Sequence, residues 1–96
     1  KHFHHYRKVM IVCGPGNNGA DGISLGIKLF KEGKEVLLCY SGLPEKLSQA
    51  NNYYVQQVDN LGIETLFLDE ESLDEFQRRM NDYDVVVDAL FGFGLI

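Results

Sequence analysis

The sequence lacks several features that mark whole classes of protein. No apolar run approaches the roughly 20 residues that a membrane-spanning helix needs, which argues against a transmembrane protein. A basic excess is also missing: 9 lysines and arginines stand against 14 aspartates and glutamates. The resulting net charge of -5 disfavours a nucleic-acid partner. Neither an internal repeat nor a low-complexity linker is present, so a single domain is expected.

Cysteine and zinc-type patterns are scarce as well. The two cysteines, Cys13 and Cys39, have the spacing of neither a metal site nor a redox pair, so we expect buried free thiols in a reducing compartment. His2, His4 and His5 match no standard zinc spacing, and no metal is expected there. Because the chain begins without methionine, the absence of a targeting segment carries little weight.

What the sequence does contain is the composition of a small globular domain. Of its 96 residues, 45% are hydrophobic and 24% are charged, as in folded soluble proteins. Short apolar runs alternate with segments of helical spacing. The predicted strands are Lys8–Cys13, residues 35–40, Glu64–Leu68 and residues 83–90, and the predicted helices are residues 18–33, 45–61 and 72–80. Gly33 and Gly62 are expected to end helices, and Ser72 with Glu75 has capping-box spacing.

This alternation predicts right-handed βαβ units around a parallel sheet. The apolar strands indicate burial on both faces. The expected class is therefore α/β, a Rossmann-like three-layer αβα sandwich with a mostly parallel sheet. The chain stops just after the fourth predicted strand, where a glycine-rich loop begins over residues 91–94. A sheet with its switch point at the edge is a poor place to end, so residues 1–96 are expected to form a partial domain.

Residues 14–22, GPGNNGADG, join the first predicted strand to the first helix. We call this segment the glycine loop. Glycines allow a tight turn and a close backbone approach, and a helix N-terminus offers N–H groups to an anion. Gly14, Gly16 and Gly19 also satisfy G-x-G-x-x-G, which is a weak signal by itself. The glycine loop predicts a nucleotide at the carboxyl end of the first strand.

Two features distinguish this loop from that of an ordinary NAD dehydrogenase. The second strand ends in LCYS, without the acid that would bind ribose hydroxyls. Asn17, Asn18 and Asp21 crowd the turn with oxygens, and a carboxylate beside a phosphate is repulsive unless a cation or donors intervene. Taken singly, the asparagines fit turn formation or N-capping, and Asp21 fits the helix dipole of the first turn. The three together favour a binding site.

Asp88 is the second polar element, within VVVDALFGFG near the end of the fourth strand. In the common 3-2-1-4 strand order the fourth strand lies beside the first, so Asp88 is expected to face Asn18 at the switch point. Oxygen ligands without histidine or cysteine suit a hard cation. The alternative is a solvated or capped aspartate at a strand end.

GPGNNGADG together with VVDALFGFG resembles the YjeF N-terminal-domain family, the NAD(P)H-hydrate epimerases, over nearly the whole chain. The resemblance implies a Rossmann-like, often dimeric isomerase. Such an enzyme interconverts the R and S forms of hydrated NADH and NADPH, which are damaged cofactors. A partner dehydratase, separate or fused, would then restore the coenzyme from the S form. The implied location is the cytoplasm, or the mitochondrion if a transit peptide is missing.

The resemblance also implies residue roles. Substrate contacts would come from Asn17, Asn18, Gly19, Ala20, Asp21, Gly92, Phe93 and Gly94. Asn18 and Asp88 would help to bind a potassium ion. Ala20 departs from the glycine expected between Gly19 and Asp21; its methyl group could narrow the turn but spares every oxygen ligand. No catalytic residue is assigned, because the acid/base aspartate is expected beyond residue 96. The C-terminal half of the domain and an N-terminal helical segment are likewise expected outside the chain.

Two other functions stay open at this point. A non-catalytic dimerising module, like the YjeF-type domain of decapping scaffold proteins, is expected to lose the Asn-Asn-Gly-x-Asp signature, which this chain keeps. A conventional dinucleotide oxidoreductase is disfavoured by the missing acid after the second strand. Tyr53 and Tyr54 on the second predicted helix fit either a core or a dimer surface.

Overall fold

The computed structural model describes residues 7–41, 49–90 and 94–95, and the statements below hold for those ranges. The elements follow one another as β1 (Lys8–Cys13), α1 (Asn17–Lys31), β2 (Glu35–Ser41), α2 (Gln49–Leu61), β3 (Glu64–Leu68), α3 (Leu73–Met80), β4 (Val85–Ala89) and β5 (Gly94–Leu95). The sheet has the order β3-β2-β1-β4-β5. β1 to β4 run parallel and β5 pairs antiparallel with β4. The predicted α/β class and 3-2-1-4 order are confirmed.

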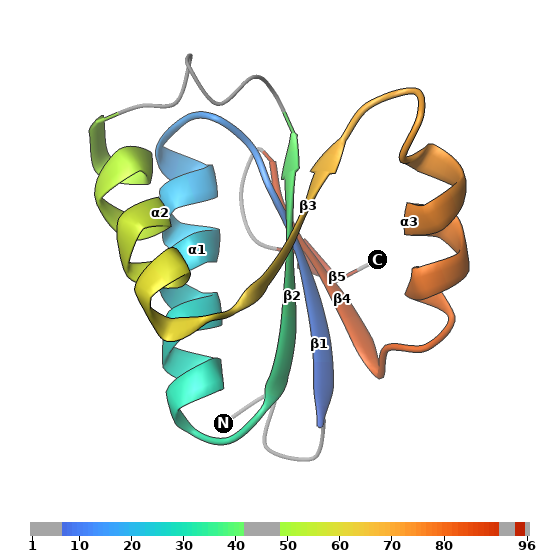
Figure 1. Ribbon diagram of the computed structural model, residues 1–96, viewed down its shortest axis with the longest axis horizontal. Helices are drawn as coiled ribbons and strands as arrows, with labels where there is room; N and C mark the ends of the chain where they lie inside the picture. Colours follow the sequence, from blue (N-terminus) through green and yellow to red (C-terminus); the bar gives the residue numbers. More distant parts are fainter. Residues whose placement is uncertain (1–6, 42–48, 91–93, 96) are drawn as a thin grey trace.

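The sheet separates two helical layers, with α1 and α2 on one face and α3 on the other (Figure 1). Strand side chains alternate between the faces because their period is two. Val9, Ile11 and Cys13 therefore join the core under α1 and α2, whereas Met10 and Val12 join the core on the α3 side. The three-layer αβα sandwich is confirmed.

Glycine ends the first two helices, as predicted. Gly33 and Gly62 follow α1 and α2 with φ of +93° and +75°, in the left-handed region where a Cβ is disfavoured. The Gly33 N–H donates to the Phe30 carbonyl at 3.0 Å. Each helix therefore turns back toward the next strand.

Ser72 is the N-cap residue of α3, as predicted, but its side chain makes no capping hydrogen bond, so the predicted capping box is wrong. Its backbone is already helical, with φ -93° and ψ -3°, and it makes no side-chain cap hydrogen bond. The hydroxyl instead accepts the Asp69 N–H at 2.9 Å and donates to the Phe67 carbonyl at 2.7 Å. Serine hydroxyls can bond to several neighbouring backbone groups. Here the Ser72 hydroxyl bonds to backbone groups of the turn before α3 and not to the first amides of the helix.

Both ends of the sheet differ from expectation. Burial on both faces is wrong for β3, none of whose residues is buried, because an edge strand has a neighbour on one side only. Beyond β4, Gly94 pairs with Asp88 in β5, so placing Gly94 in a loop was also wrong. This pairing satisfies backbone groups that an edge strand would leave open. Gly92 and Phe93 lie outside the described residues.

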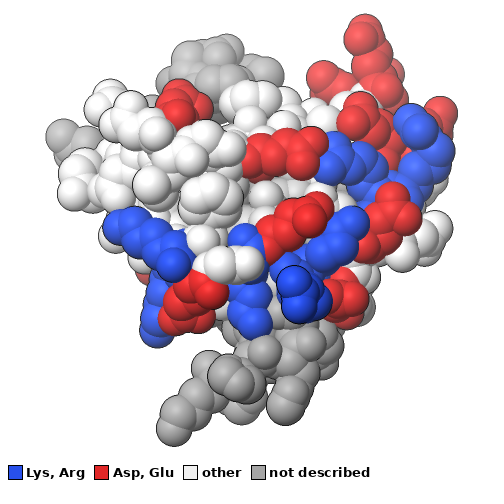
Figure 2. Space-filling view, turned by 60° about the horizontal axis from the view of Figure 1, so that its bottom comes forward, with Lys and Arg blue, Asp and Glu red and all other residues white. Residues whose placement is uncertain are grey.

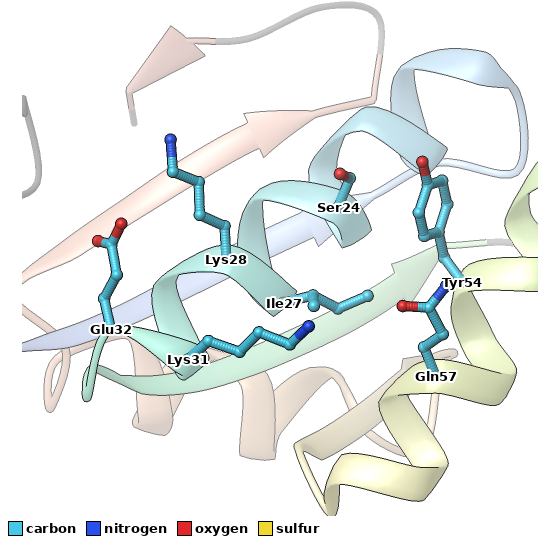
Figure 3. A pocket seen from close by; sticks show the side chains of 7 residues that line it. All are labelled: Ser24, Ile27, Lys28, Lys31, Glu32, Tyr54 and Gln57. Carbon is cyan, nitrogen blue, oxygen red and sulfur yellow. The ribbon is translucent and has the colours of Figure 1, made fainter.

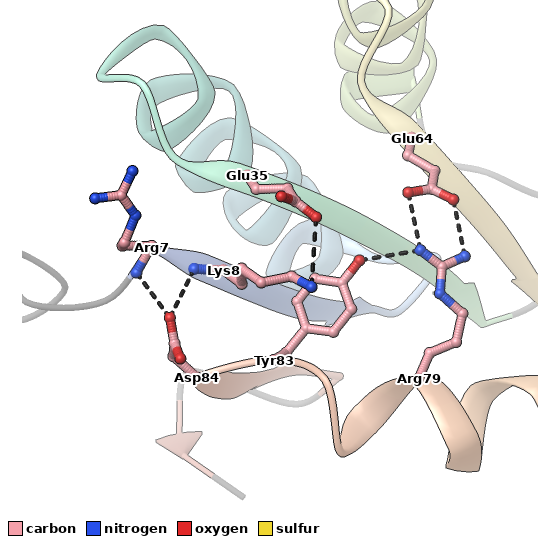
Figure 4. A network of polar contacts seen from close by, with 7 residues as sticks. All are labelled: Arg7, Lys8, Glu35, Glu64, Arg79, Tyr83 and Asp84. Atoms are coloured by element: carbon pink, nitrogen blue, oxygen red, sulfur yellow. Dashed lines mark hydrogen bonds and ion pairs between the residues drawn. The ribbon is translucent and has the colours of Figure 1, made fainter.

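Charged side chains gather at the amino ends of the strands. Figure 2 brings forward the bottom of Figure 1 and shows basic and acidic side chains intermixed there. The Asp84 carboxylate accepts the N–H groups of Arg7 and Lys8, each at 2.9 Å (Figure 4). These two donors lower the Asp84 pKa. The bonds tie the residue before β4 to the start of β1.

Arg79 ties α3 to the same end of the sheet. Its guanidinium donates to both Glu64 oxygens at 2.8 and 2.9 Å, and to the Tyr83 hydroxyl at 3.0 Å (Figure 4). Lys8 adds an ion pair with Glu35 at 3.7 Å. With its amino ends held by this network, the sheet carries the predicted site at its opposite, carboxyl edge.

Candidate functional site

The glycine loop leaves β1 after Cys13 and enters α1 at Asn17, at the top of Figure 1. Gly16 is the N-cap, with φ -91° and ψ -161°. Its carbonyl accepts the Ala20 N–H at 3.2 Å. A glycine cap has no side chain to bond the first helical amides. The start of α1 therefore points backbone N–H groups toward the carboxyl edge of the sheet, where an anion is favoured.

The predicted substrate residues of the first motif lie in the first turns of α1. Gly19 and Ala20 are buried, whereas Asn18 and Asp21 are exposed. Asn17 is the first helical residue, so neither asparagine is the N-cap. The first turn contains no acidic residue, which places Asp21 beyond it. The capping and dipole alternatives are thus weakened, and the exposed oxygens stand where a ligand can reach them.

Glycines in α1 permit a very close approach to the sheet. A Cβ on Gly19 would collide with the Gly14 carbonyl oxygen, and one on Gly22 would lie 2.6 Å from the Ala89 Cβ. Ala20 between them is only 4% exposed. The methyl group that departs from the expected glycine is therefore accommodated inside the fold.

Asp88 lies on β4 beside Val12 of β1, so the predicted neighbourhood of the two strands is confirmed. Its Oδ1 accepts the Leu90 N–H at 2.9 Å, which is the contact of a strand-end aspartate. Alternation puts Asp88 on the face of Val86, whereas α1 covers the other face. Among the described residues, no hydrogen bond or ion pair joins Asp88 to Asn18, so a shared ion stays a hypothesis.

Backbone contacts bring the glycine loop against the end of β4. The Gly14 N–H donates to the Ala89 carbonyl at 3.3 Å. A Cβ on Gly14 would meet the Leu90 carbonyl oxygen at 3.1 Å and the Leu90 Cα at 3.3 Å. Sequence reasoning missed Leu90, because it is an ordinary apolar residue whose backbone makes the contact.

Tyr40 occupies the end of β2, where a dehydrogenase would carry its ribose-binding acid. The side chain is 2% exposed, and burial raises its pKa. Its hydroxyl has no hydrogen-bond partner within the described part of the chain. The ring packs on Phe67 with centroids 5.1 Å apart. Tyr40 thus contributes an apolar body to the core and supplies no carboxylate for a ribose.

Two surface hollows lie apart from the glycine loop. One of about 450 Å³ lies between α1 and α2 and is lined by Ser24, Ile27, Lys28, Lys31, Glu32, Tyr54 and Gln57 (Figure 3). The other, of about 540 Å³, lies among the charged residues at the amino ends of the strands. Neither is lined by any residue from 14 to 22.

The expected buried free thiols are confirmed. Cys13 and Cys39 are both buried and unpaired, and burial raises the pKa of each to about 12. The described residues contain no group of three or more histidine, cysteine, aspartate or glutamate side chains that could hold a metal. His2, His4 and His5 lie outside those residues. In the same ranges, no helix combines the length and apolar character needed to cross a membrane.

Comparison with known sequences reveals relatives along most of the chain. The bifunctional NAD(P)H-hydrate repair enzyme Nnr of Thermofilum pendens is 39% identical over 85 residues, which are 88% of this chain and 16% of that protein. The chloroplastic pyridoxine/pyridoxamine 5'-phosphate oxidase 1 of Arabidopsis thaliana is 36% identical over 92% of this chain and 16% of its own length. The NAD(P)H-hydrate epimerase of Dictyostelium discoideum is 37% identical over 91% of this chain and 34% of its own.

A solved structure and a family pattern agree with these relatives. The crystal structure of yeast YNL200c superposes with a TM-score of 0.74 at 28% identity, covering 90% of this chain and 35% of that one. The chain therefore spans about a third or less of the length of these proteins. The sequence model described as YjeF-related protein N-terminus matches residues 1–96. Since that match runs through the whole chain, the protein belongs to the YjeF N-terminal-domain family.

Proposed function

We propose that the intact protein is an NAD(P)H-hydrate epimerase, an isomerase that interconverts the R and S forms of hydrated NADH and NADPH. The observation that carries the proposal is the exposed pair Asn18 and Asp21 at the start of α1, next to the strand that bears Asp88. The names of the Dictyostelium and Thermofilum relatives support it. A dimerising interaction module has no need of these oxygens, so the epimerase is preferred to it.

The start of α1 is suited to the phosphates of a dinucleotide. Its backbone N–H groups attract an anion, and Asn17, Asn18, Gly19, Ala20 and Asp21 would contact the substrate there. Gly92 and Phe93, outside the described residues, and Gly94 in β5 would contribute from the end of β4. The exposed Asp21 carboxylate repels a phosphate unless a cation intervenes.

Potassium fits the donors that the chain offers. Asn18 and Asp88 supply oxygen ligands with one formal negative charge between them, whereas calcium sites normally gather several carboxylates. Oδ1 of Asp88 is engaged by Leu90, and its second oxygen makes no hydrogen bond within the described ranges. When bound, the ion would supply positive charge beside the phosphate. Asn18 and Asp88 would hold it from neighbouring elements.

The described residues bind and orient the nucleotide in this scheme. Epimerisation requires proton transfer near the ring hydroxyl, and we assign it to an aspartate after residue 96. A dehydratase, separate or fused, would consume the S form. We further propose a homodimer, in which Tyr53, 63% exposed on α2, is a candidate contact, whereas Tyr54 packs on the core. The expected compartment is the cytoplasm or, with a transit peptide, the mitochondrion.

The direct test is epimerisation by the intact protein. An R-enriched sample of hydrated NADPH should approach the R/S equilibrium faster than it does without protein, as followed by chromatography. The same substrate should raise the melting temperature, because a ligand at 100 times its Kd stabilises the native state by about 2.7 kcal/mol. Unchanged epimer ratios together with an unchanged melting temperature would contradict the assignment.

A further inference from the structure

The glycine loop and the end of β4 are connected through a short series of backbone contacts. The first is the hydrogen bond from the Leu90 N–H to Asp88 Oδ1, 2.9 Å long and partly buried. It fixes the Leu90 peptide relative to the Asp88 side chain, two residues earlier on the strand.

The second contact joins Leu90 to the glycine loop. A Cβ on Gly14 would lie 3.1 Å from the Leu90 carbonyl oxygen and 3.3 Å from the Leu90 Cα. Both neighbours are main-chain atoms, so only the lack of a side chain at Gly14 lets the two backbones lie this close. The Gly14 N–H adds a hydrogen bond to the Ala89 carbonyl at 3.3 Å. The Gly14 backbone is therefore packed against the end of β4.

The third contact carries the series into α1. The Gly14 carbonyl lies so close to Gly19 that a Cβ on Gly19 would collide with its oxygen. Gly19 is in the first turn of α1, directly after Asn18. The next residue, Ala20, donates its N–H to Gly16 at 3.2 Å. The position of Gly14 therefore constrains where the helix begins.

We propose that Asp88 is a positioning residue for the glycine loop. By holding the Leu90 N–H, it keeps the Leu90 backbone against Gly14 and thereby fixes the start of α1, where the nucleotide is expected to bind. This role is separate from cation binding because it uses Oδ1 toward a backbone amide and requires an acceptor, not a charge. Its effect on substrate rests on the proposed function, whereas the coupling itself does not.

Hydrogen exchange tests the coupling without substrate or potassium. Backbone amides of the intact protein are followed by NMR in tetramethylammonium buffer, for wild type, Asp88→Asn and Asp88→Ala. Asparagine retains an oxygen acceptor for Leu90, and alanine does not. Loss of a hydrogen bond of this kind is worth about a tenfold change in exchange. We expect Asp88→Ala to speed exchange at Leu90, and also at Gly14 and Ala20, while Asp88→Asn stays near wild type.

A matched glycine pair approaches the coupling from the other side. Gly14→Ala places a methyl group against the Leu90 backbone, whereas at Gly16 a Cβ would meet nothing within 4 Å. Neither glycine has a positive φ, so alanine strains neither backbone. Gly14→Ala should therefore speed exchange of the Leu90 amide, and Gly16→Ala should not. If Asp88→Ala does not fold, these two glycine variants alone test the coupling between Leu90 and the glycine loop.

The outcomes separate the coupling from the proposed function. Faster exchange confined to Leu90 in Asp88→Ala overturns the proposal, and so do equal Leu90 rates in Gly14→Ala and Gly16→Ala. In the epimerase assay at saturating potassium, the positioning role predicts a higher KM for Asp88→Ala than for Asp88→Asn. A wild-type protein without epimerase activity would reject the proposed function and leave the exchange result standing.

Discussion

Asp21 is an exposed carboxylate at the start of α1, and exposed charges contribute little to folding. Asp21→Ala should therefore change the free energy of unfolding by about 1 kcal/mol or less. Epimerase activity should fall strongly, because the substrate loses a contact at the glycine loop. Denaturant unfolding and the epimer assay measure the two effects on the same sample.

Asp82 provides the matched control for Asp21. It is equally an exposed aspartate, but it lies in the turn after α3, near the amino ends of the strands. Asp82→Ala should retain wild-type activity. Full activity in Asp21→Ala would remove Asp21 from the site, and equal losses in both variants would indicate a general effect of charge.

The potassium hypothesis concerns Asn18 and Asp88. Replacing tetramethylammonium by potassium at constant ionic strength should raise the activity of the intact protein. Asp88→Asn should weaken this dependence, because the amide retains an oxygen but loses the charge that attracts the cation. Identical rates in both salts, for wild type and variant alike, would leave Asp88 with its strand-end contact to Leu90 alone.

Among the elements, α1 is packed on the sheet through glycines that differ in what opposes them. A methyl group at Gly22 would lie 2.6 Å from the Ala89 Cβ, which is fixed to the strand backbone. Gly22→Ala should therefore destabilise the fold by about 1–3 kcal/mol through overpacking. This exceeds the gain of about 1 kcal/mol that alanine normally brings to a helix interior.

Gly26 is the control for Gly22 in the same helix. There a methyl group would lie 2.7 Å from Leu38 Cδ2, which is the end of a side chain and not an atom fixed to the strand backbone. Gly26→Ala should be milder than Gly22→Ala and nearly neutral, because helix propensity offsets the contact. Thermal denaturation compares the melting temperatures of the two variants. A smaller loss of stability in Gly22→Ala than in Gly26→Ala would contradict this prediction.

The pairing of α3 with β3 predicts a pH dependence. The Arg79 hydrogen bonds lower the Glu64 pKa, so this pair stabilises the fold above the unfolded glutamate value of about 4.3. The contribution is lost as the pH falls through the lower folded pKa. Glu64 is 54% exposed, so solvent screening limits the cost of Glu64→Gln at neutral pH to about 1 kcal/mol.

The measurement is unfolding of wild type and Glu64→Gln at several pH values, and their difference should close below the Glu64 pKa. Glu75→Gln is the control, since Glu75 meets Arg79 only at 3.6 Å within the helix. Helical pairs of this kind contribute about 0.3–0.5 kcal/mol. A difference that grows on acidification would contradict the sign of the Glu64 shift.

Local signals predicted the elements well, because each depends on neighbours in sequence. The apolar runs gave β1 and β3 with their observed bounds, and glycine gave the ends of α1 and α2. Ser72 was correctly predicted as the N-cap of α3, but the capping box failed because its hydroxyl bonds to the backbone of Phe67 and Asp69 instead. Gly94 failed because pairing with β4 is a property of the sheet edge.

The candidate site was predictable to the same extent. The motif gave the exposed oxygens of Asn18 and Asp21, and strand order placed Asp88 beside β1. The role of Leu90 could not be predicted, because its main-chain atoms make the contact with Gly14 and every residue type has the same main chain. The orientation of Asp88 away from the α1 face required the register of the folded sheet.

For the whole molecule, the reactivity of Cys13 and Cys39 reports whether the central strands β1 and β2 remain folded and buried. Both are buried on adjacent strands with a pKa of about 12, so roughly one thiol in ten thousand is ionised at pH 8. Neither should react with a maleimide in the native protein. With rising denaturant, both should react in step with the loss of secondary structure, as followed by mass spectrometry and circular dichroism.

Cys39 serves as the internal control for Cys13, which borders the glycine loop. If Cys13 reacts at denaturant concentrations where Cys39 does not, the carboxyl edge of β1 opens locally before the sheet unfolds. Equal labelling of the two is the expected result, because β1 is paired on both sides and lies at the centre of the sheet.

The central place of β1 also bears on how the chain matures during translation. Of the described strands, β1 is made first, but it is paired on its second side only when β4 arrives, and Lys8 and Asp84 are 76 residues apart. At about 5–20 residues per second, a ribosome takes roughly 4–15 s to cover that distance. During this interval the nascent β1 has one bare side, and Gly14 has neither Ala89 nor Leu90 against it. The contacts that hold the glycine loop against the end of β4 are therefore among the last of the described contacts to form.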